Sequence, residues 1–196
     1  MVPAMPRIIH LAGFPGSGRT SWCLSQARQV LESEQRVVWI STQATDPQRF
    51  AQVMLGLHPQ HAARFHSYPA GEEFSNALLM VSNLIPQLPS TRLVVIEDWS
   101  DDKGAPQRIL RENLKTLLSI ISQGGIDLIL TTLAYEDASG NGDADAMRVR
   151  SRSWFEEQGF ETWRLEHIES KPGRRLLVTP DERAEWKLND AGIGAV

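Results

Sequence analysis

Short apolar runs alternate with helix-like segments over the first two thirds of the chain. Each run is bounded by polar or turn residues, which is typical of the buried strands of a parallel sheet. The predicted strands of this part are 8–12, 36–41, 65–68, 93–97 and 126–132. The helices predicted between them are 20–33, 47–57, 73–85 and 108–122. The pattern therefore predicts an α/β fold with a mostly parallel central sheet flanked by helices.

The last third of the chain shows a different pattern, in which apolar and polar positions alternate. A helix is predicted over 147–158 and a strand over 162–168, and antiparallel strands are predicted at 176–178 and 185–188. The segment before this part is rich in Asp, Gly, Ser and Asn, and we expect a mobile loop at about 134–147. We expect a single domain over residues 1–196, with no separate N-terminal domain and a C-terminal antiparallel extension.

The composition is that of an ordinary globular protein, with 41% hydrophobic residues, 22% charged residues and a net charge of −4. Such a chain has no bulk attraction to nucleic acid or to an anionic membrane, so any such binding depends on local patches. The single cysteine, Cys23, excludes an internal disulfide. There is no signal peptide and no apolar run of spanning length. We therefore expect an intracellular protein with no membrane partner, cytoplasmic or, in a eukaryote, nuclear.

The segment with the clearest chemistry joins the first predicted strand to the first predicted helix. It matches the phosphate-binding pattern G-x-x-x-x-G-K-[ST], except that Arg19 stands where the pattern has Lys. Glycines let backbone N–H groups turn toward a phosphate, and the following helix directs the positive end of its dipole at the same point. The predicted ATP-binding residues are Gly13, Phe14, Pro15, Gly16, Ser17, Gly18, Arg19, Thr20 and Ser21.

Two details of this loop affect its chemistry. Thr20 is placed to bind Mg²⁺ through its hydroxyl group. Arg19 keeps the positive charge of the usual lysine but replaces a compact ammonium group with a wide, planar fork. The alternative interpretation is a tight turn between strand and helix that binds no ligand.

Two acidic residues, Glu97 and Asp98, end the most apolar of the predicted strands. An acid at this position normally holds the water shell of Mg²⁺ and orients the loop threonine. Both residues are candidates because the apolar run can be registered either way, and Asp98 is the first choice. The alternative is a solvated strand end without a metal.

Gln43 follows the second predicted strand, where a water-activating residue is expected. An amide can orient a water molecule but cannot take its proton, and the loss of a general base costs roughly 10²–10⁴-fold in rate. The phosphate loop, Gln43, Asp98 and Thr131 all fall at the carboxyl ends of predicted strands, where ligands bind on sheets of this kind. Together with Arg19, Gln43 predicts a protein that binds ATP and hydrolyses it slowly or not at all.

The order of these segments resembles the RecA/RadA recombinase superfamily over nearly the whole chain. The sequence is most similar in organisation to members that consist of the ATPase core alone, namely archaeal RadB and the divergent recombinase paralogues, including the small partner of SWIM-domain proteins. The resemblance implies a RecA-like P-loop NTPase core with a C-terminal antiparallel hairpin extension. It rests on the phosphate loop, residues 41–45, 93–98 and 126–132, the strand residues 164–166, the basic hairpin after them, and residues 189–193.

Several positions depart from the family pattern. The pattern places its catalytic glutamate at Gln43, its phosphate lysine at Arg19, and its nucleotide-sensing amide near Thr132 and Leu133, where no match is found. The oligomerisation stretch Phe-x-x-Ala is missing from residues 1–7. The resemblance therefore implies an accessory protein of homologous recombination and DNA repair whose partner is a recombinase or another recombinase paralogue.

Weak binding of single-stranded DNA is a further expectation. The two DNA-binding loops of the family would fall at about 99–108 and 134–150. Basic residues on or beside predicted loops are the candidates for contacts with DNA phosphates, and the alternative is a solvated surface cluster. The candidates are Arg148, Arg150, Arg152, Lys171, Arg174 and Arg175.

Two other functions stay open at the level of the sequence. One is an active P-loop NTPase or kinase of another pathway, in which some other residue serves as the base. The other is a pseudo-ATPase that binds no nucleotide and serves only as a partner subunit. His10, within the first predicted strand, is interpreted as a core residue and not as a catalyst.

Overall fold

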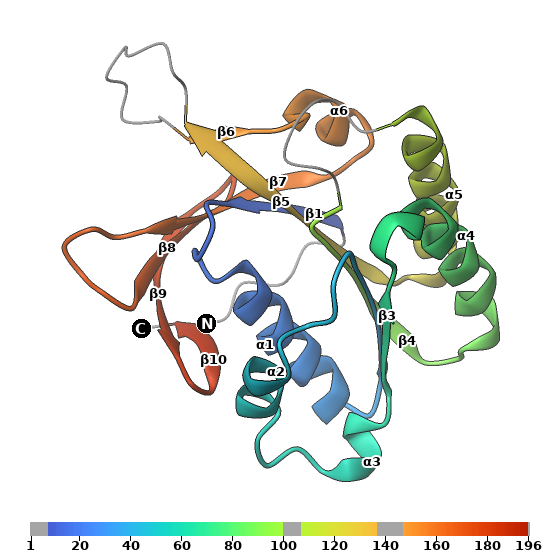
Figure 1. Cartoon of the computed structure of the whole chain (residues 1–196), viewed down its shortest axis with the longest axis horizontal. Coiled ribbons are helices and arrows are strands. Elements are labelled where there is room, and N and C mark those ends of the chain that lie inside the picture. The colour runs from blue at the N-terminus through green and yellow to red at the C-terminus, as the bar shows by residue number, and fades with distance from the viewer. Residues whose placement is uncertain (1–7, 100–106, 137–146, 196) are drawn as a thin grey trace.

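A mixed sheet runs through the middle of the molecule, with helices on both of its faces (Figure 1). The computed structural model describes residues 8–99, 107–136 and 147–195. The strands are β1 (Ile8–Gly13), β2 (Arg36–Ser41), β3 (Phe65–Pro69), β4 (Thr91–Glu97), β5 (Asp127–Glu136), β6 (Met147–Val149), β7 (Glu161–His167), β8 (Arg174–Val178), β9 (Arg183–Asn189) and β10 (Gly192–Ala195). The α-helices are α1 (Arg19–Glu32), α2 (Pro47–Val53), α3 (Pro59–Ala62), α4 (Phe74–Leu84), α5 (Arg108–Gly124) and α6 (Arg152–Glu157). Two 3₁₀ helices, η1 (Gly71–Glu73) and η2 (Ile85–Gln87), flank α4.

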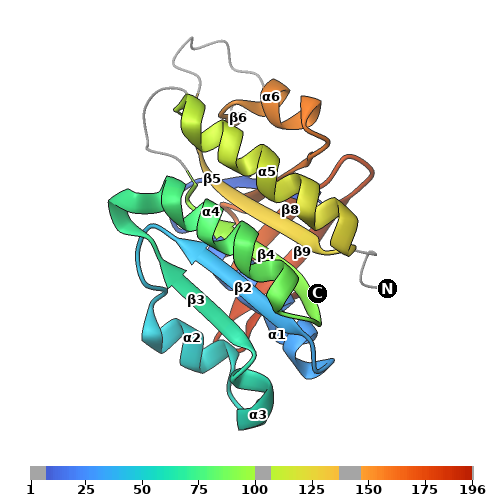
Figure 2. The ribbon, with the colours of Figure 1, turned by 90° about the vertical axis from the view of Figure 1, so that its right-hand side faces the viewer.

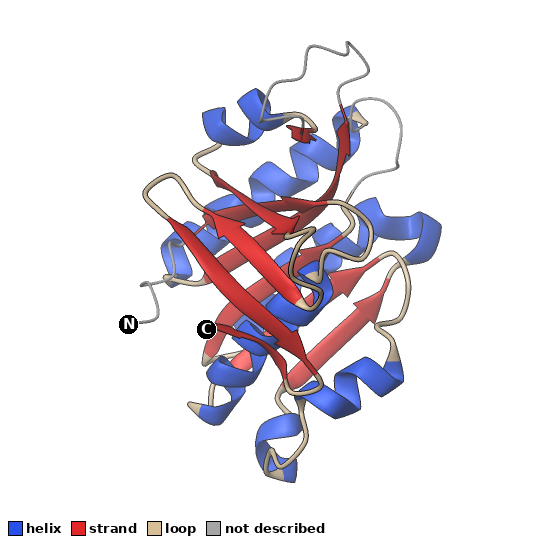
Figure 3. Cartoon of the chain, turned by 90° about the vertical axis from the view of Figure 1, so that its left-hand side faces the viewer, coloured by secondary structure: helices blue, strands red, loops and turns tan. Residues whose placement is uncertain are grey.

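The sheet has the strand order β10-β9-β8-β7-β1-β5-β4-β2-β3, and β6 pairs with β5 outside this path. All neighbours from β7 to β3 along this path are parallel. The strands from β7 to β10 are antiparallel to one another, and they cross the front of Figure 3. The predicted fold class, a mostly parallel α/β sheet with a C-terminal antiparallel extension, is confirmed.

The core consists of two apolar layers, one on each face of the sheet. On β4, Leu93 and Val95 face the layer beneath α1 and α2, while Val94 and Ile96 face the layer beneath α4 and α5. All four side chains are fully buried. Figure 2 shows α4 and α5 side by side in front of the sheet. Burial on both faces explains why the parallel strands are continuous apolar runs and not alternating ones.

Two local predictions were wrong, and one strand was missed. The segment 147–158 is not one helix, because Met147–Val149 pairs as β6 with the end of β5 before α6 begins. The helix predicted over 47–57 ends at Val53, and α3 follows after a turn in which Gly56 has a φ of +80°. The strand β10 was not predicted, because it is defined by its pairing with β9. That pairing depends on the turn that leads into Gly192, and the φ of Gly192, +120°, favours glycine.

The expected mobile loop at about 134–147 falls mostly outside the described residues. Residues 134–136 belong to β5 and residue 147 to β6, and residues 137–146 are not described. The expectations for 1–7 and for most of 99–108 likewise fall outside the described ranges. Within those ranges, no helix combines the length and the apolarity needed to cross a lipid bilayer.

Candidate nucleotide-binding site

The phosphate-loop segment forms the turn between β1 and α1. Gly16 and Gly18 have φ values of +73° and +98°, in the left-handed region that favours glycine, and Gly18 is the N-cap of α1. The N–H of Ser17 donates to the carbonyl oxygen of Phe14 at 3.1 Å and closes the turn. The carbonyl of Gly18 accepts the first helical hydrogen bond, from the N–H of Trp22 at 2.9 Å. The amides of residues 19–21 therefore have no acceptor within the helix, and they suit an anion.

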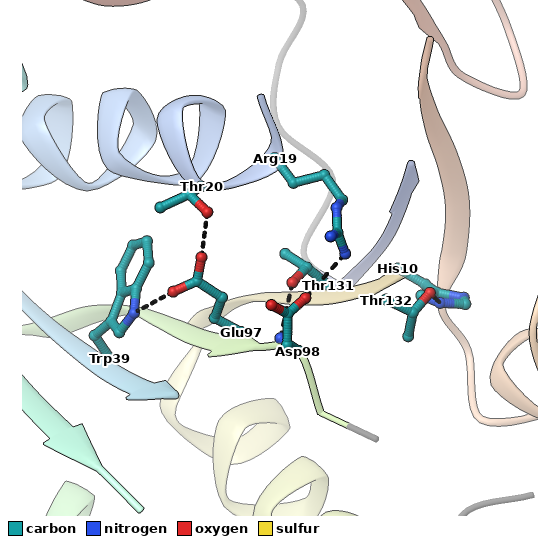
Figure 4. Close-up of polar contacts among 8 residues, drawn as sticks. All are labelled: His10, Arg19, Thr20, Trp39, Glu97, Asp98, Thr131 and Thr132. Atoms are coloured by element: carbon teal, nitrogen blue, oxygen red, sulfur yellow. Dashed lines mark hydrogen bonds and ion pairs between the residues drawn. The ribbon is translucent and has the colours of Figure 1, made fainter. Parts of the chain in front are cut away.

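The hydroxyl group of Thr20 lies against the carboxylate at the end of β4. Thr20 Oγ1 donates a hydrogen bond to Glu97 Oε1, and Trp39 Nε1 donates to Glu97 Oε2 at 3.2 Å (Figure 4). Glu97 is only 8% exposed. Burial raises its pKa above the ordinary value of 4.5, and the two hydrogen bonds act in the opposite direction. The site thus holds a carboxylate in a position where its negative charge is poorly solvated.

The second acid, Asp98, faces a different partner. Arg19 Nη1 lies 3.0 Å from Asp98 Oδ1, and the Asp98 side chain is 45% exposed (Figure 4). Asp98 has a φ of +50°, and its backbone N–H donates to Thr131 Oγ1 at 3.0 Å. Of the two candidate acids, Glu97 therefore contacts Thr20 and Asp98 contacts Arg19. Both acids line the cleft and stay candidates for the metal role, and Glu97 is the one in contact with Thr20.

A cleft of about 700 Å³ opens beside these residues. Its volume lies within the range of roughly 300–1,000 Å³ that is common for small-molecule sites. Gln43 lines the cleft and is exposed in it, and its backbone carbonyl accepts a hydrogen bond from Ser41 Oγ at 2.5 Å. The lining residues are Thr20, Ser41, Thr42, Gln43, Ala44, Thr45, Asp46, Arg49, Glu97, Asp98 and Leu133. Of the predicted site residues, the cleft brings together Thr20 of α1, Gln43 after β2, and Glu97 and Asp98 at the end of β4. The other predicted nucleotide-binding residues, 13–19 and 21, are not among its lining residues.

Arg49, on α2, is a cleft residue that the sequence did not indicate. Its Nε donates to Ser21 Oγ at 2.7 Å, and its Nη1 donates to the carbonyl of Asn189 at 2.8 Å. The residue therefore links α1 to the turn between β9 and β10. No local signal marks it, because its partners are far away in the sequence.

The six predicted DNA contacts do not form one exposed group. Lys171 Nζ and Arg174 Nη1 both contact the carboxylate of Glu185, at 2.7 and 3.6 Å. Arg152 Nε pairs with Glu156 Oε1 at 2.7 Å, within one turn of α6. The guanidinium of Arg150 lies over the ring of Tyr135, and Arg148 lies opposite Tyr135 in the register of β6 with β5.

The sixth, Arg175, has to be corrected. Its residue is only 8% exposed, and its Nε donates to the carbonyl of Ser17 at 2.8 Å. It therefore lies beneath the phosphate loop and does not present its charge to DNA at the surface.

His10 is a core residue, as interpreted from the sequence. It is fully buried in β1, its Nε2 lies 2.8 Å from Thr132 Oγ1, and its ring packs on Phe155 at 4.0 Å between centroids. Burial lowers its pKa to about 3, and the charge of Arg152 adds to this effect. The ring is thus neutral at physiological pH and does not line the cleft.

The donor set is suited to a magnesium nucleotide. A threonine hydroxyl and a carboxylate supply the oxygen ligands that Mg²⁺ prefers, and phosphate oxygens would complete its shell. Among the described residues, no three His, Cys, Asp or Glu side chains gather as a metal site by themselves. The geometry therefore fits a metal ion that arrives with a nucleotide.

The layers, the strand order and the loop after β1 together define a RecA-like α/β fold. No protein-family model matches the sequence, and no curated protein sequence matches it. Among solved structures, the chain is similar to the crystal structure of the RadB recombinase, with a TM-score of 0.74 and 19% sequence identity. The match covers 97% of this chain and 91% of that one. The RecA-like recombinase fold implied by the sequence is thereby confirmed.

Proposed function

We propose that the protein binds ATP with Mg²⁺ and acts as an accessory recombinase paralogue in homologous recombination and DNA repair. In this proposal it hydrolyses ATP slowly or not at all and works through a recombinase or another recombinase paralogue inside the cell. The observation that carries the proposal is the arrangement of the cleft. Thr20 and Glu97 are paired at the end of the phosphate loop, and an amide, Gln43, lines the same cleft at the position to which the resemblance assigns the catalytic glutamate.

In this proposal, different residues bind the phosphates and the metal ion. The amides at the start of α1 would hold phosphate oxygens, and the side chains of Thr20 and Glu97 would hold the metal ion. Bound Mg²⁺ would neutralise charge on the phosphates. It would also compensate the poorly solvated carboxylate of Glu97. These roles support ATP as a tightly held ligand.

Slow hydrolysis follows from the chemistry of Gln43. Its amide, exposed in the cleft, can donate a hydrogen bond to a water molecule and accept one from it. It cannot remove the proton of the water when the oxygen attacks phosphorus. The bound nucleotide would then serve mainly to stabilise the protein and not to supply energy by hydrolysis.

The proposed partners rest on the fold and on the resemblance. The likeness to the RadB recombinase extends over 97% of the chain and supports a role beside recombinases. Single-stranded DNA is proposed as a weak additional ligand, held by the basic residues near β6 and before β8. Of these residues, Lys171 and Arg174 share one carboxylate, which reduces the charge that they offer.

Two measurements on the purified protein test nucleotide binding and turnover. Anisotropy titration with a fluorescent ATP analogue should show saturable, Mg²⁺-dependent binding that Thr20→Ala weakens at least about tenfold. Steady-state turnover should be close to background, and Gln43→Glu should raise it by on the order of 10²-fold because a carboxylate returns to the water position. Gln48→Glu, which adds the same charge at an exposed position on α2, should leave turnover unchanged.

The alternatives give different results. Robust turnover that survives Gln43→Ala would identify an active NTPase or kinase with another base. A folded protein that binds no nucleotide would be a pseudo-ATPase partner subunit. Either result would contradict the proposal.

A further inference from the structure

A buried cation that has no acidic partner among the described residues lies directly beneath the phosphate loop. Arg175, on β8, is 8% exposed, and its Nε and Nη2 donate to the carbonyls of Ser17 and Gly16 at 2.8 and 3.4 Å. Its Nη1 donates to the carbonyl of Arg174 at 2.7 Å. Across the part of the chain that the structure describes, no carboxylate lies within 4.0 Å of this guanidinium. Buried charges are normally paired with opposite charges, so this one requires an explanation.

The contacts of Arg175 fix the direction of the loop amides. In a trans peptide unit the C=O and the N–H point in opposite directions. With the carbonyl of Ser17 turned toward Arg175, the N–H of Gly18 points away from the guanidinium. The guanidinium thus orients one backbone donor of the phosphate loop.

Other contacts join the same antiparallel extension to the loop and to α1. Leu188 of β9 packs against Gly18, where an added Cβ would lie 3.5 Å from Leu188 Cδ1. The N–H of Ile193 on β10 donates to Ser25 Oγ on α1 at 3.0 Å, and β10 lies alongside α1 (Figure 1). Arg175 is therefore held in a packed interface, which gives its contacts with the loop a defined geometry.

The charge of Arg175 matters because the other arginine at the loop is already paired. Arg19 contacts Asp98, so part of its charge is compensated by a carboxylate. The positive charge of Arg175 has no such compensation among the described residues. Because little of Arg175 is exposed, solvent screens its charge less than it would screen that of a fully exposed arginine.

We propose that Arg175 is a positioning residue for the phosphate loop, which it holds by two carbonyls while its uncompensated charge attracts the polyphosphate of the nucleotide. In this role Arg175 adds to the attraction that the loop exerts on the polyphosphate. Arg19 supplies less of this attraction because Asp98 compensates part of its charge. The inference rests on the proposed nucleotide binding. It adds to the nucleotide-binding site a residue of the C-terminal extension that does not itself touch the ligand.

The test compares ligands of increasing charge with charge-altered variants of the full chain. Arg175→Gln should weaken ATP binding by about tenfold, weaken ADP binding less, and leave competition by adenosine unchanged. Arg175→Lys keeps the charge and should recover most of the affinity for ATP. The matched control is Arg183→Gln, an exposed arginine on β9 that should behave as the wild type.

Circular dichroism and thermal melts check that each variant is folded. Wild-type ATP affinity in folded Arg175→Gln, or an equal loss for ATP and adenosine, would overturn the role of Arg175 alone. If Arg175→Gln does not fold, folded Arg175→Lys decides: a retained ratio of ATP to adenosine affinity supports the role, and a lost ratio overturns it. A wild-type protein that binds no nucleotide would overturn both this inference and the proposed function.

Discussion

At the scale of single residues, the site contains a carboxylate whose burial lowers the free energy of unfolding. Glu97 is buried at the end of β4, and its two described hydrogen-bond donors, Thr20 and Trp39, compensate only part of its lost hydration. Groups that lower stability are commonly retained at functional sites, since their function depends on the same chemistry. A divalent cation beside Thr20 would remove this cost, which gives the unfavourable burial a functional explanation.

Neutralising this carboxylate should therefore stabilise the protein while it impairs binding. Without nucleotide or Mg²⁺, Glu97→Gln should raise the free energy of unfolding at pH 7 by about 1 kcal/mol, because it removes a buried charge. The raised pKa of Glu97 means that the folded state holds this proton more tightly than the unfolded state. The stability that protonated Glu97 contributes is fully present below pH 4.5, and it is lost as the pH rises through the folded-state pKa of this carboxyl group.

The measurement is urea denaturation of wild type and Glu97→Gln between pH 4.5 and pH 7, with Mg²⁺-ATP binding in parallel. The stability difference should grow with pH, and Mg²⁺-dependent binding should be lost. Glu112→Gln, on the exposed face of α5, should change stability by less than about 1 kcal/mol at every pH. A variant that is less stable than the wild type at pH 7 would contradict this account of Glu97.

At the scale of elements, the site is a consequence of parallel strand order. The strands β1, β4 and β2 all point in the same direction, so their carboxyl ends lie along one edge of the sheet. Each strand leads to a polar group that lines the cleft: Thr20 after β1, Glu97 at the end of β4 and Gln43 after β2. Buried parallel strands of this kind can be recognised from their apolar runs, which is why these groups were predicted to meet.

The two basic segments near β6 and before β8 are the elements on which DNA binding depends. Charge reversal at Arg148 and Arg174 together should weaken binding of a single-stranded oligonucleotide and make its salt dependence shallower by about 0.7 per lost phosphate contact. The measurement is anisotropy at several salt concentrations. Lys115→Glu, which makes the same kind of change at an exposed position of α5, should have little effect. Unaltered binding in the double variant would identify these residues as a solvated surface cluster.

At the scale of the whole molecule, the C-terminal antiparallel strands complete the layer that contains α1. Trp163, Trp186 and Ile193 belong to the same apolar cluster as Trp22 and Leu24 of α1. The helix that carries the phosphate loop is thus packed on strands from both ends of the chain. A ligand held at the loop would stabilise this whole layer, because binding to the folded state alone shifts the folding equilibrium.

A partner that prefers the nucleotide-bound form should therefore be captured better in the presence of ATP. Affinity capture from native cell extract, with and without Mg²⁺-ATP, should recover a recombinase or a recombinase paralogue. Recovery should increase severalfold with ATP for the wild type but not for Thr20→Ala. Recovery of only proteins unrelated to recombination would exclude the proposed pathway.

Much of the fold followed from local patterns in the sequence. Apolar runs and helical spacing predicted the five parallel strands before residue 137 and the larger helices, and glycine spacing predicted the phosphate loop. These features depend on short-range preferences and on burial on both faces of the sheet, which a linear sequence records. The short strands β6 and β10 were missed because each is defined by pairing with another strand and not by its own composition.

The side-chain partners at the site were decided by the tertiary structure. The sequence determined that Glu97 and Asp98 end a strand near a phosphate loop, but the twist and register of the sheet decided that Glu97 faces Thr20 and Asp98 faces Arg19. Arg175 was predicted on a surface and lies under the loop instead, because β8 returns alongside β7, the parallel neighbour of β1. These contacts join residues 77, 79 and 158 positions apart, and contacts at such separations leave no local trace, so only the folded chain reveals them.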